Sequence, residues 1–520
     1  MPYAAAKPGI LFNAAVSWLG FAVQLVIAFF LAPVLVHGLG DERNGIWSLV
    51  ESILAYLMLF DLGVAASVVR YVARFETTRD WDKLNRIFST SLIIFGMAGA
   101  LTFFVAWALA FPFLETLGVA SDLRPETRGM LILLGFNLAA GLPLGVFPCV
   151  LDGLGKYPTK TILRTGLLLV RTVIFVVIMK QEGGLIELAW AITTCNLAEH
   201  LLMGVAAWWY LPGLRFSFSY VDRATFRTIR GYSVDAFLAM VAGRISFQTD
   251  AVVIGSFLSA RFITFFTISA RLVEYAKNAV RALTTVLVPA ISSLEARGDT
   301  ESIRQVLVDG TRYVLWIIIP VEAALVLLGK PFLALWMGAR YVDLCYPTLV
   351  ILTIPLAVAM AQSVAARVLY GMGRLRWYAR AVMAEGAINL LLSMALVRPL
   401  GIEGVALGTC IPNVLNNILI MAYVCQVVGL DIGLYVRRAW ILPTGAGMVL
   451  AAGWWVIGTQ PATPTWTWFL VTGSVGVSLY WGFAALMEIG KEPVVRRLQY
   501  WMGYRASVSP LALAEDGIRE

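Results

Sequence analysis

The stretch FSTSLIIFGMAGALTFFVAWALAFPF runs from residue 88 to residue 113 and contains no Asp, Glu, Lys or Arg. An α-helix rises about 1.5 Å per residue, so about 20 apolar residues are enough to cross a hydrocarbon core of about 30 Å. Charged residues precede the stretch, among them Asp82, Lys83 and Arg86. The segment therefore predicts a transmembrane helix bounded by water-facing charge.

Similar apolar stretches recur along the whole chain, separated by short patches of charge, Gly and Pro. Of the 520 residues, 59% are hydrophobic and 14% charged, against about 45–50% apolar in an average soluble domain. We expect an all-α integral membrane protein with about 14 transmembrane helices. The expected spans lie near 10–37, 46–70, 88–113, 129–155, 159–179, 184–211, 232–257, 263–292, 312–336, 347–371, 377–397, 403–430, 437–458 and 467–489.

The positive charge of the chain suggests lipid headgroups as partners. The net charge is +8, but the basic residues occupy short connections and form no stripe beside stacking aromatics, so nucleic acid is not an expected partner. The five cysteines show no metal-ligand spacing. Because there is also no nucleophile motif and no phosphate-binding Gly loop, we expect neither an enzyme nor a cofactor.

The distribution of Lys and Arg predicts the orientation. With the N-terminus inside, most of the 40 Lys and Arg fall in the cytoplasmic connections and the two tails. The outer loops hold only Arg43, Arg124, Arg128, Lys180, Arg261, Lys330, Arg340 and Arg398. Cytoplasmic loops carry such an excess, so we expect a multi-pass protein with both termini in the cytoplasm.

An internal repeat predicts two lobes. One constant shift places Gly153–Lys156 (GLGK) on Gly371–Arg374 (GMGR), and without a gap also Lys180 on Arg398 and Gly183 on Gly401. Six spans separate the copies, and an even number gives parallel, pseudo-symmetric six-helix lobes. We expect an N-terminal lobe at 1–211, a linker at 212–231, a C-terminal lobe at 232–430, two additional helices at 431–489 and a tail with an amphipathic segment at 490–520.

Basic residues within the apolar cores are the candidate site. A charge facing lipid at mid-depth costs about 3 kcal/mol or more, so such residues are expected to face a partner or a water-filled cavity. They are Arg171, Arg244, Arg271, Lys277, Arg281 and Arg367. In the eighth span, spacings of three and four residues put a polar set on one helical face, which we expect to line a cavity. The set is Arg271, Glu274, Lys277, Asn278, Arg281 and Thr285.

Polar stripes on the first and seventh spans are expected to converge with that face. They comprise Asn13, Ser17 and Gln24, and Arg244 and Gln248. Arg244, Arg271, Lys277 and Arg281 would then contact an anion, and a diphosphate matches guanidinium forks well. The alternative is that long basic side chains snorkel to the interface, or pair structurally, as Arg271 with Glu274 or Arg244 with Asp250 or Asp235.

Acidic residues in the spans are candidates for ion coupling. They are Asp61, Asp250, Glu274, Glu322 and Glu385, and no spacing singles out one of them. Two further stretches, Thr78 to Ile87 and Pro493 to Tyr504, predict amphipathic helices at the membrane interface.

Local sequences resemble a known family. Residues 31–75 contain Leu39–Gly40, Gly45–Ser48 (GIWS) and Asp61–Gly63 (DLG), a pattern similar to the first two helices of the polysaccharide flippases of the multidrug/oligosaccharidyl-lipid/polysaccharide exporter superfamily. Residues 369–409 resemble the second-lobe signature of that family, and Leu335–Gly338 (LWMG) resembles the end of its ninth helix.

This resemblance implies a flippase of the bacterial inner membrane. Its substrate would be an undecaprenyl-diphosphate-linked oligosaccharide, an O-antigen or exopolysaccharide repeat unit, moved to the periplasmic leaflet by alternating access. Membrane lipids, a polysaccharide polymerase and glycosyltransferases are the partners it implies.

Three other functions are weighed against it. A multidrug and toxin extrusion antiporter would have twelve helices and an acidic cation site. A peptidoglycan lipid II flippase would have an arginine-rich first helix, whereas no Lys or Arg lies between Lys7 and Arg43. A saccharide polymerase would have a large outer loop, whereas the expected outer loops are of ordinary length.

Overall fold

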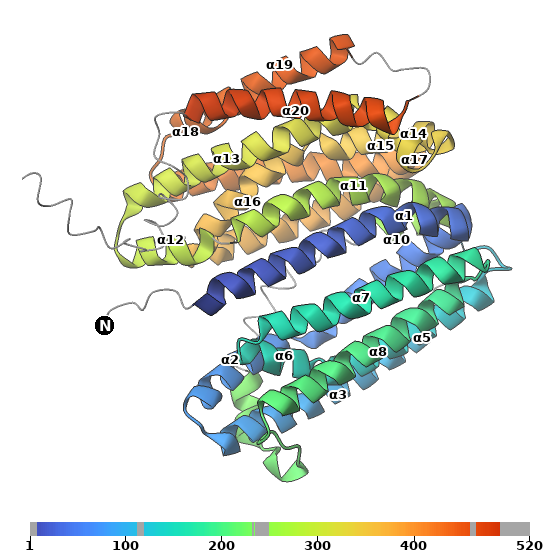
Figure 1. Cartoon of the computed structure of the whole chain (residues 1–520), viewed down its shortest axis with the longest axis vertical. Helices are drawn as coiled ribbons and strands as arrows, with labels where there is room; N and C mark the ends of the chain where they lie inside the picture. Colours follow the sequence, from blue (N-terminus) through green and yellow to red (C-terminus); the bar gives the residue numbers. More distant parts are fainter. Residues whose placement is uncertain are drawn as a thin grey trace, which may run out of the picture. The chain divides into compact units, whose positions relative to one another are not determined.

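The computed structural model describes residues 8–111, 119–230, 233, 249–285, 287–457 and 464–488. Every regular element in those ranges is a helix or a 3-10 turn (Figure 1). The expected all-α fold is therefore confirmed. The chain divides into two compact units: unit 1 holds Met1–Thr267 with Val397–Val405, and unit 2 holds Ile268–Leu396 with Ala406–Glu520.

Unit 1 is a bundle of long helices, with the short helices α2 and α6 at one end (Figure 1). Helices α3, α5, α8 and α7 pack in that order as neighbours, and α7 also packs against α1. The short helix α2 packs against α6 and α3. Its elements are α1 (Pro8–Leu57), η1 (Met58–Asp61), α2 (Val64–Thr77), α3 (Trp81–Leu109), α5 (Arg124–Leu144), α6 (Val146–Gly153), α7 (Tyr157–Lys180), α8 (Leu185–Tyr210), η2 (Phe218–Tyr220) and α10 (Thr249–Phe257).

Unit 2 is arranged around α13, which packs against α16, α19 and α18. Two elements are shared between the units, because α11 starts in unit 1 and α17 returns to it for residues 397–405. The elements are α11 (Ala260–Thr284), α12 (Leu287–Ala296), α13 (Thr300–Leu327), α14 (Gly329–Trp336), η3 (Ala339–Tyr341), α15 (Val342–Thr353), α16 (Leu356–Gly371), α17 (Leu375–Val427), α18 (Ile432–Ala439), α19 (Ile441–Ile457) and α20 (Trp466–Glu488).

In the described residues the helices follow the expected spans, but their ends differ, and most of the expected span 232–257 lies outside those residues. Two helices are longer than one span, and each contains a glycine with positive φ at which it kinks: Gly40 in α1 and Gly401 in α17. Several other spans are broken, as between α15 and α16, where Pro355 cannot continue the helix. Within the described residues, eight helices are long and apolar enough to cross a membrane, or nine if α18 and α19 form one span. The number fourteen thus stays a prediction.

The two copies of the repeat form the same turn. Gly155 has φ +68° and Gly373 has φ +69°, a region that glycine adopts without steric cost. The N–H of Lys156 donates to the carbonyl of Leu151 at 2.8 Å, and that of Arg374 donates to the carbonyl of Leu369 at 2.9 Å. The backbone therefore repeats at this turn.

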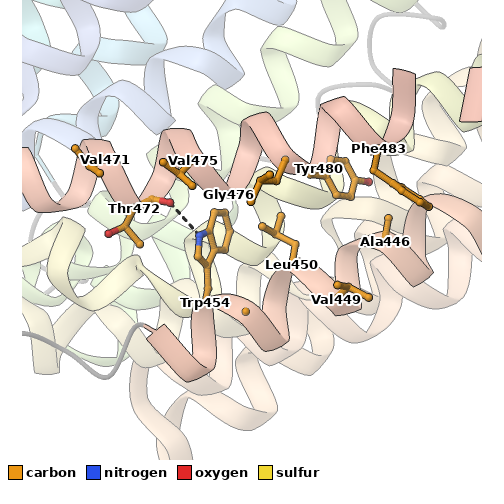
Figure 2. A pocket seen from close by; sticks show the side chains of 12 residues that line it. Ala446, Val449, Leu450, Trp454, Val471, Thr472, Val475, Gly476, Tyr480 and Phe483 are labelled. Atoms are coloured by element: carbon orange, nitrogen blue, oxygen red, sulfur yellow. Dashed lines mark hydrogen bonds between the residues drawn. The ribbon is translucent and has the colours of Figure 1, made fainter. Parts of the chain in front are cut away.

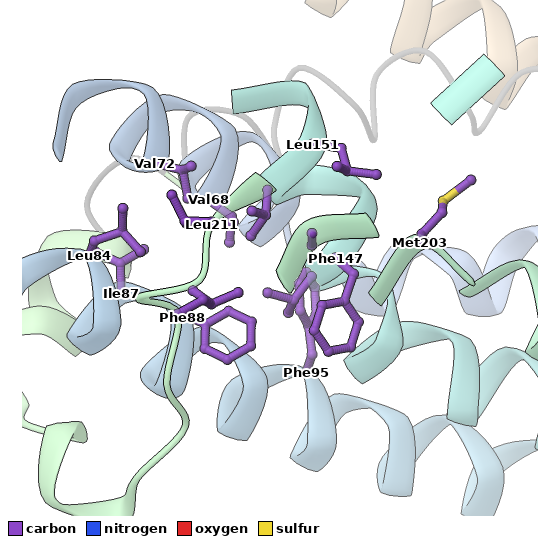
Figure 3. Close-up of a cluster of buried hydrophobic side chains, with 14 of the residues drawn as sticks. Val68, Val72, Leu84, Ile87, Phe88, Phe95, Phe147, Leu151, Met203 and Leu211 are labelled. Carbon is purple, nitrogen blue, oxygen red and sulfur yellow. The ribbon is translucent and has the colours of Figure 1, made fainter. Parts of the chain in front are cut away.

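Unit 1 has a hydrophobic core at the end where α3 begins. Apolar side chains from α2, α3, α6 and α8 meet there, and Phe88, Val150 and Met203 are fully buried (Figure 3). Leu211, Leu214 and Ile229, from the connection that follows α8, belong to the same cluster. This connection is therefore packed onto unit 1.

Two expectations about shorter segments need comment. The separate amphipathic helix expected at Thr78 to Ile87 is absent from these described residues, because Asp80 caps a helix that begins at Trp81, and the segment forms the first turns of α3. The amphipathic stretch from Pro493 to Tyr504 lies outside the described residues. The lobe boundaries at 211 and 232 stay a prediction, and the compact units divide at residue 267.

Candidate functional site

The polar face of α11 lies in unit 2 from Arg271 onwards, and each of its charged side chains is half-buried. Nη1 of Arg281 donates to Oε1 of Glu274 at 2.6 Å and to Oδ1 of Asn278 at 3.4 Å. The side chains of Arg281 and Glu274 keep 33% and 42% of their exposure. The structure thus pairs Glu274 with a residue two turns away. Both side chains remain partly exposed.

The other predicted site residues are spread over the chain. Gln24 is exposed on α1, and Asp250 is half-buried in the first turn of α10, both in unit 1. Asn13 lies in α1. Arg244 and Gln248 lie outside the described residues. The predicted convergence of these residues with the α11 face therefore stays a prediction.

Asp61 has a local structural role in unit 1. Its Oδ1 accepts a hydrogen bond from the N–H of Ala65 at 3.2 Å, where Leu62 and Gly63 have positive φ and interrupt the second span. The carboxylate thus satisfies one of the otherwise unpaired N–H groups at the start of α2.

Glu385 forms the best-organised polar cluster in unit 2. It lies in the first half of α17, and the second half supplies two amide donors: Asn413 Nδ2 at 2.7 Å and Asn416 Nδ2 at 2.5 Å, one to each carboxyl oxygen. Asn417 donates to Asn413 Oδ1 at 2.8 Å, which orients that amide. Lys277 of the α11 face lies within electrostatic range of the carboxylate.

The spacing of three asparagines in the sequence indicates this cluster. Asn413, Asn416 and Asn417 have spacings of three and four residues, so they share one helical face. Three amides on one face of an apolar span need buried partners, since an unsatisfied polar group in lipid is costly. Their partner, Glu385, is one of the five acidic residues that the sequence offers as candidates for ion coupling.

Glu322 caps a broken helix. It lies on α13, and its Oε2 accepts a hydrogen bond from the N–H of Ala357 at 3.2 Å. Ala357 is in the first turn of α16, just after the break at Pro355. The first N–H groups of a helix have no intrahelical partner, so the carboxylate satisfies one of them inside the span.

Arg171 is the charged group between α7 and α8 in unit 1. Its Nη1 donates to Oδ1 of Asn196 at 3.3 Å, and Glu199 lies within electrostatic range. The imidazole of His200 is hydrogen-bonded through Nδ1 to the carbonyl of Asn196 at 2.7 Å. The intramembrane arginine is therefore held by partners from α8.

An apolar groove of about 540 Å³ lies between α19 and α20 (Figure 2). Trp454 closes its middle, because its Nε1 donates to the carbonyl of Thr472 at 3.1 Å and its indole lies against Gly476. Val449 and Leu479 on its walls are 74% and 71% exposed. The groove can accept a hydrocarbon chain but offers little to a polar group.

Two family models match adjoining parts of the chain. The model of polysaccharide biosynthesis proteins matches residues 169–346, which include the whole of α11, and the MatE model matches residues 15–177. A probable low-salt glycan biosynthesis flippase of Haloferax volcanii is 21% identical over 250 residues, which are 48% of this chain and 53% of that protein. The chain thus matches about half the length of this curated relative.

Solved structures share the fold. The lipid II flippase MurJ, in an inward closed conformation, matches 92% of this chain and 99% of its own, with a TM-score of 0.74 and 13% identity. A multidrug resistance MATE family transporter of the MOP superfamily, in an inward-facing conformation, matches 78% of this chain and 94% of its own, with a TM-score of 0.67 and 15% identity. Both are transport proteins of the same helical architecture. The chain is a multi-pass membrane protein that shares the fold of these transport proteins, and parts of it match the family models of polysaccharide biosynthesis proteins and of MatE proteins.

Proposed function

We propose that this chain carries no enzymatic activity and moves an undecaprenyl-diphosphate-linked oligosaccharide from the cytoplasmic to the periplasmic leaflet of a bacterial inner membrane by alternating access. The observation that carries this proposal is the polar face of α11, which sets Arg271, Lys277 and Arg281 in a span within the stretch that matches polysaccharide biosynthesis proteins. Both termini would lie in the cytoplasm, as the distribution of Lys and Arg predicts.

The chemistry of this face fits a diphosphate headgroup. Guanidinium groups bind phosphate oxygens through paired N–H donors, and these charge-assisted bonds are about twice as strong as neutral ones. Arg281 already holds a carboxylate, that of Glu274, through one of these donors, Nη1. A diphosphate would compete for the same donors. When the substrate enters, its phosphate would therefore replace the carboxylate of Glu274 on Arg281. Arg244 and Gln248, together with Asn13 and Gln24, are proposed to complete the site.

The lipid tail needs a separate apolar path. The groove between α19 and α20 is lined by aliphatic and aromatic side chains along its length (Figure 2). An isoprenoid chain is the natural occupant, because it is apolar and attached to the headgroup that the α11 face would hold. The tail would then stay in hydrocarbon while the headgroup crosses.

Glu385 offers a way to couple transport to a cation. When it is ionised, its two oxygens accept from Asn413 and Asn416, and its charge offsets that of Lys277. Protonation would remove the negative charge beside Lys277 and so strengthen the attraction of the α11 face for an anion. Cation uptake and substrate binding would then favour each other. Asp61, Asp250 and Glu274 remain further proposed coupling residues, although Asp61 and Glu274 have the local partners described above.

Two other functions fit the same fold. The MurJ structure matches nearly the full chain, which favours a lipid II flippase as the second candidate. A drug antiporter is the third candidate. It would need an acidic site for cations, whereas the face of α11 is basic and suits anions. A partnership with polysaccharide polymerases and glycosyltransferases would accompany saccharide export and not drug export.

Complementation separates these functions. The gene is introduced into strains that lack an O-antigen flippase, a lipid II flippase or a drug antiporter, and surface saccharide, survival and drug resistance are scored. Rescue of surface saccharide alone is expected. Rescue of either other strain in its place would overturn the proposal.

The same saccharide strain tests the site. Arg271→Ala and Arg281→Ala are expected to abolish rescue while membrane insertion persists. Arg261→Ala changes an exposed arginine on the same helix and is expected to leave rescue intact. Full rescue by both of the first two variants would remove the α11 face from the proposed site.

A further inference from the structure

The connection after α8 is pinned to α3 by side chains one turn apart. Asn85 Nδ2 donates to the carbonyl of Gly213 at 3.1 Å, and the N–H of Arg215 donates to Asn85 Oδ1 at 2.9 Å. Ser89 Oγ accepts from the N–H of Ser217 at 3.3 Å. Both side chains are buried, with 4% exposure for Asn85 and 0% for Ser89. Residues 213–222, which we call the α3 hairpin, are therefore fixed in position.

The order of these bonds gives the direction of the hairpin. Residue 213 is bonded at Asn85 and residue 217 at Ser89, so the chain advances in the direction in which α3 enters the membrane. Ser89 follows Trp81 by eight residues, about 12 Å of helix rise. The uncharged stretch of α3 begins at residue 88. The chain after α8 therefore runs back towards the bilayer and not out into water.

The hairpin then turns and returns. Its tip is η2, Phe218–Tyr220, which packs beside α3. On the return, Asp222 Oδ2 accepts from Arg86 Nη1 at 3.1 Å, so residue 222 is back near the level of Arg86. Asp222 Oδ1 also accepts from the N–H of Thr225 at 2.7 Å and caps the helical residues 223–230. The tip is thus the part of the hairpin closest to the apolar stretch of α3.

The side chains at the tip are apolar and exposed. Phe218 is 74% exposed, Phe216 42% and Val221 36%, and the two phenylalanine rings contact each other at 5.2 Å between centroids. Exposed arginines flank them: Arg215, Arg223 and Arg227. Asp222, bonded to Arg86, is the single acid between residues 213 and 230. The aromatic tip is complementary to the apolar edge of a membrane, and the arginines that flank it are complementary to the phosphate layer.

Neighbouring aromatics lie at the same boundary. The last turn of α8 ends in Trp209, 81% exposed, and Tyr210, 39% exposed. At the start of α3, the ring of Trp81 lies against Gly213 of the hairpin. Tryptophan and tyrosine concentrate at membrane–water interfaces, where their rings are apolar and their edges polar. The hairpin therefore starts from the interface itself.

We propose that the α3 hairpin is an interfacial anchor that inserts Phe216 and Phe218 into the leaflet where α3 begins and binds the phosphates of anionic lipids through Arg215 and Arg223. The hydrogen bonds to Asn85 and Ser89 fix the hairpin before it meets lipid, so little further ordering is needed on insertion. In the predicted orientation this is the cytoplasmic leaflet. The anchor holds this end of unit 1 at a set depth in the membrane.

The depth of the tip tests this directly. A nitroxide is attached at Phe218→Cys in the full-length chain with its native cysteines replaced by Ala, and the protein is reconstituted in equimolar phosphatidylglycerol and phosphatidylethanolamine vesicles. Collision rates with oxygen, which concentrates in lipid, and with a water-soluble nickel chelate are then compared. The matched control is Thr78→Cys, an exposed turn residue before α3. The ratio of oxygen to nickel collisions is expected to be several times higher at 218 than at 78.

A second pair of variants separates the apolar and the ionic contacts. With the label moved to Ser219→Cys, replacement of both Phe216 and Phe218 by Ser is expected to bring the ratio down to that of the control. Replacement of Arg215 and Arg223 by Gln is expected to make the ratio the same in anionic and in phosphatidylcholine vesicles. Equal nickel access at 218 and 78 would overturn the proposal, and is also the result expected if a soluble protein were the partner.

Discussion

The pair α7 and α8 in unit 1 and the two halves of α17 in unit 2 occupy equivalent positions in the repeat, but the charged groups that their asparagines bind have opposite sign. In the register that aligns the two turns, Leu167 corresponds to Glu385, Arg171 to Asn389 and Glu199 to Asn417. Unit 1 keeps a cation, Arg171, bonded to Asn196. Unit 2 keeps an acid, Glu385, bonded to Asn413 and Asn416.

This difference separates two kinds of function. An arginine is charged at every pH at which a protein is folded, so the α7–α8 position holds a permanent charge. A buried carboxyl can change its charge with its environment, so Glu385, one turn before the position equivalent to Arg171, can serve as a switch. The repeat therefore preserves the backbone, as in the turns at Gly155 and Gly373, while the chemistry diverges.

The largest expected effect is at Glu385. Glu385→Gln keeps the size of the side chain but fixes it neutral, so transport should lose its dependence on an imposed pH gradient. The gradient-driven rate is expected to fall between roughly 5- and 150-fold, the range of ordinary coupling free energies. Initial rates in vesicles with and without the gradient measure this. Glu403→Gln, at an exposed position of α17, is the control and should transport like wild type.

Arg171 should respond differently. Arg171→Leu removes the donor to Asn196 and leaves Glu199 without its neighbouring cation, which is expected to cost about 1–3 kcal/mol of unfolding free energy. Thermal unfolding in detergent measures the loss, and Arg171→Lys should recover part of it. Transport by Arg171→Leu should still depend on the pH gradient. If that dependence disappears, the separation between a fixed charge and a switch is wrong.

The two turns should respond alike. Gly155→Ala and Gly373→Ala each force a side chain into left-handed backbone, and the expected cost is about 1–2 kcal/mol in both. Gly166→Ala, in the middle of α7 with ordinary φ and open space around it, is the control and should be neutral or slightly stabilising. Unequal losses at the two turns would argue against a repeated backbone.

The smallest effect concerns Asp222 in the α3 hairpin. The hydrogen bond from the backbone of Thr225, helped by Arg86, lowers the pKa of the Asp222 carboxyl below its ordinary value of 3.8. The stabilisation is present above pH 3.8 and is lost as the pH falls through the lower pKa of the folded state. A spin label at Ser219→Cys should therefore become more mobile on acidification below pH 3.8. With Asp222→Asn added, mobility should no longer change with pH.

Much of the fold could be predicted because the membrane imposes length and composition. Apolar runs such as residues 88–113 admit few alternatives to a spanning helix, and within the described residues helices lie at the expected places. The precise ends were harder, since a kink at Gly401 or a break at Pro355 depends on packing that periodicity does not encode. The same limit explains why residues 78–87 look amphipathic yet begin α3.

The candidate site was only partly predictable. Spacing alone puts Arg271, Lys277 and Arg281 on one face of α11, but it does not pair Arg281 with Glu274. The partners of Glu385 come from a segment about 30 residues later, and a single sequence does not show such contacts. The three asparagines at 413, 416 and 417 were the available clue, because amides on one face of a span require a buried partner.

One measurement tests the central claim most directly, namely that the polar face of α11 moves an anionic lipid headgroup. Vesicles containing wild type, Arg281→Lys or Arg281→Ala are loaded with an undecaprenyl-diphosphate-linked oligosaccharide, and its appearance in the opposite leaflet is followed with a membrane-impermeant reagent. Wild type should translocate the lipid, and Arg281→Ala should be slower by at least about tenfold, the loss expected for one charge-assisted hydrogen bond of about 1.5–3 kcal/mol. Arg281→Lys should fall between them. Wild-type rates with Arg281→Ala would contradict the claim.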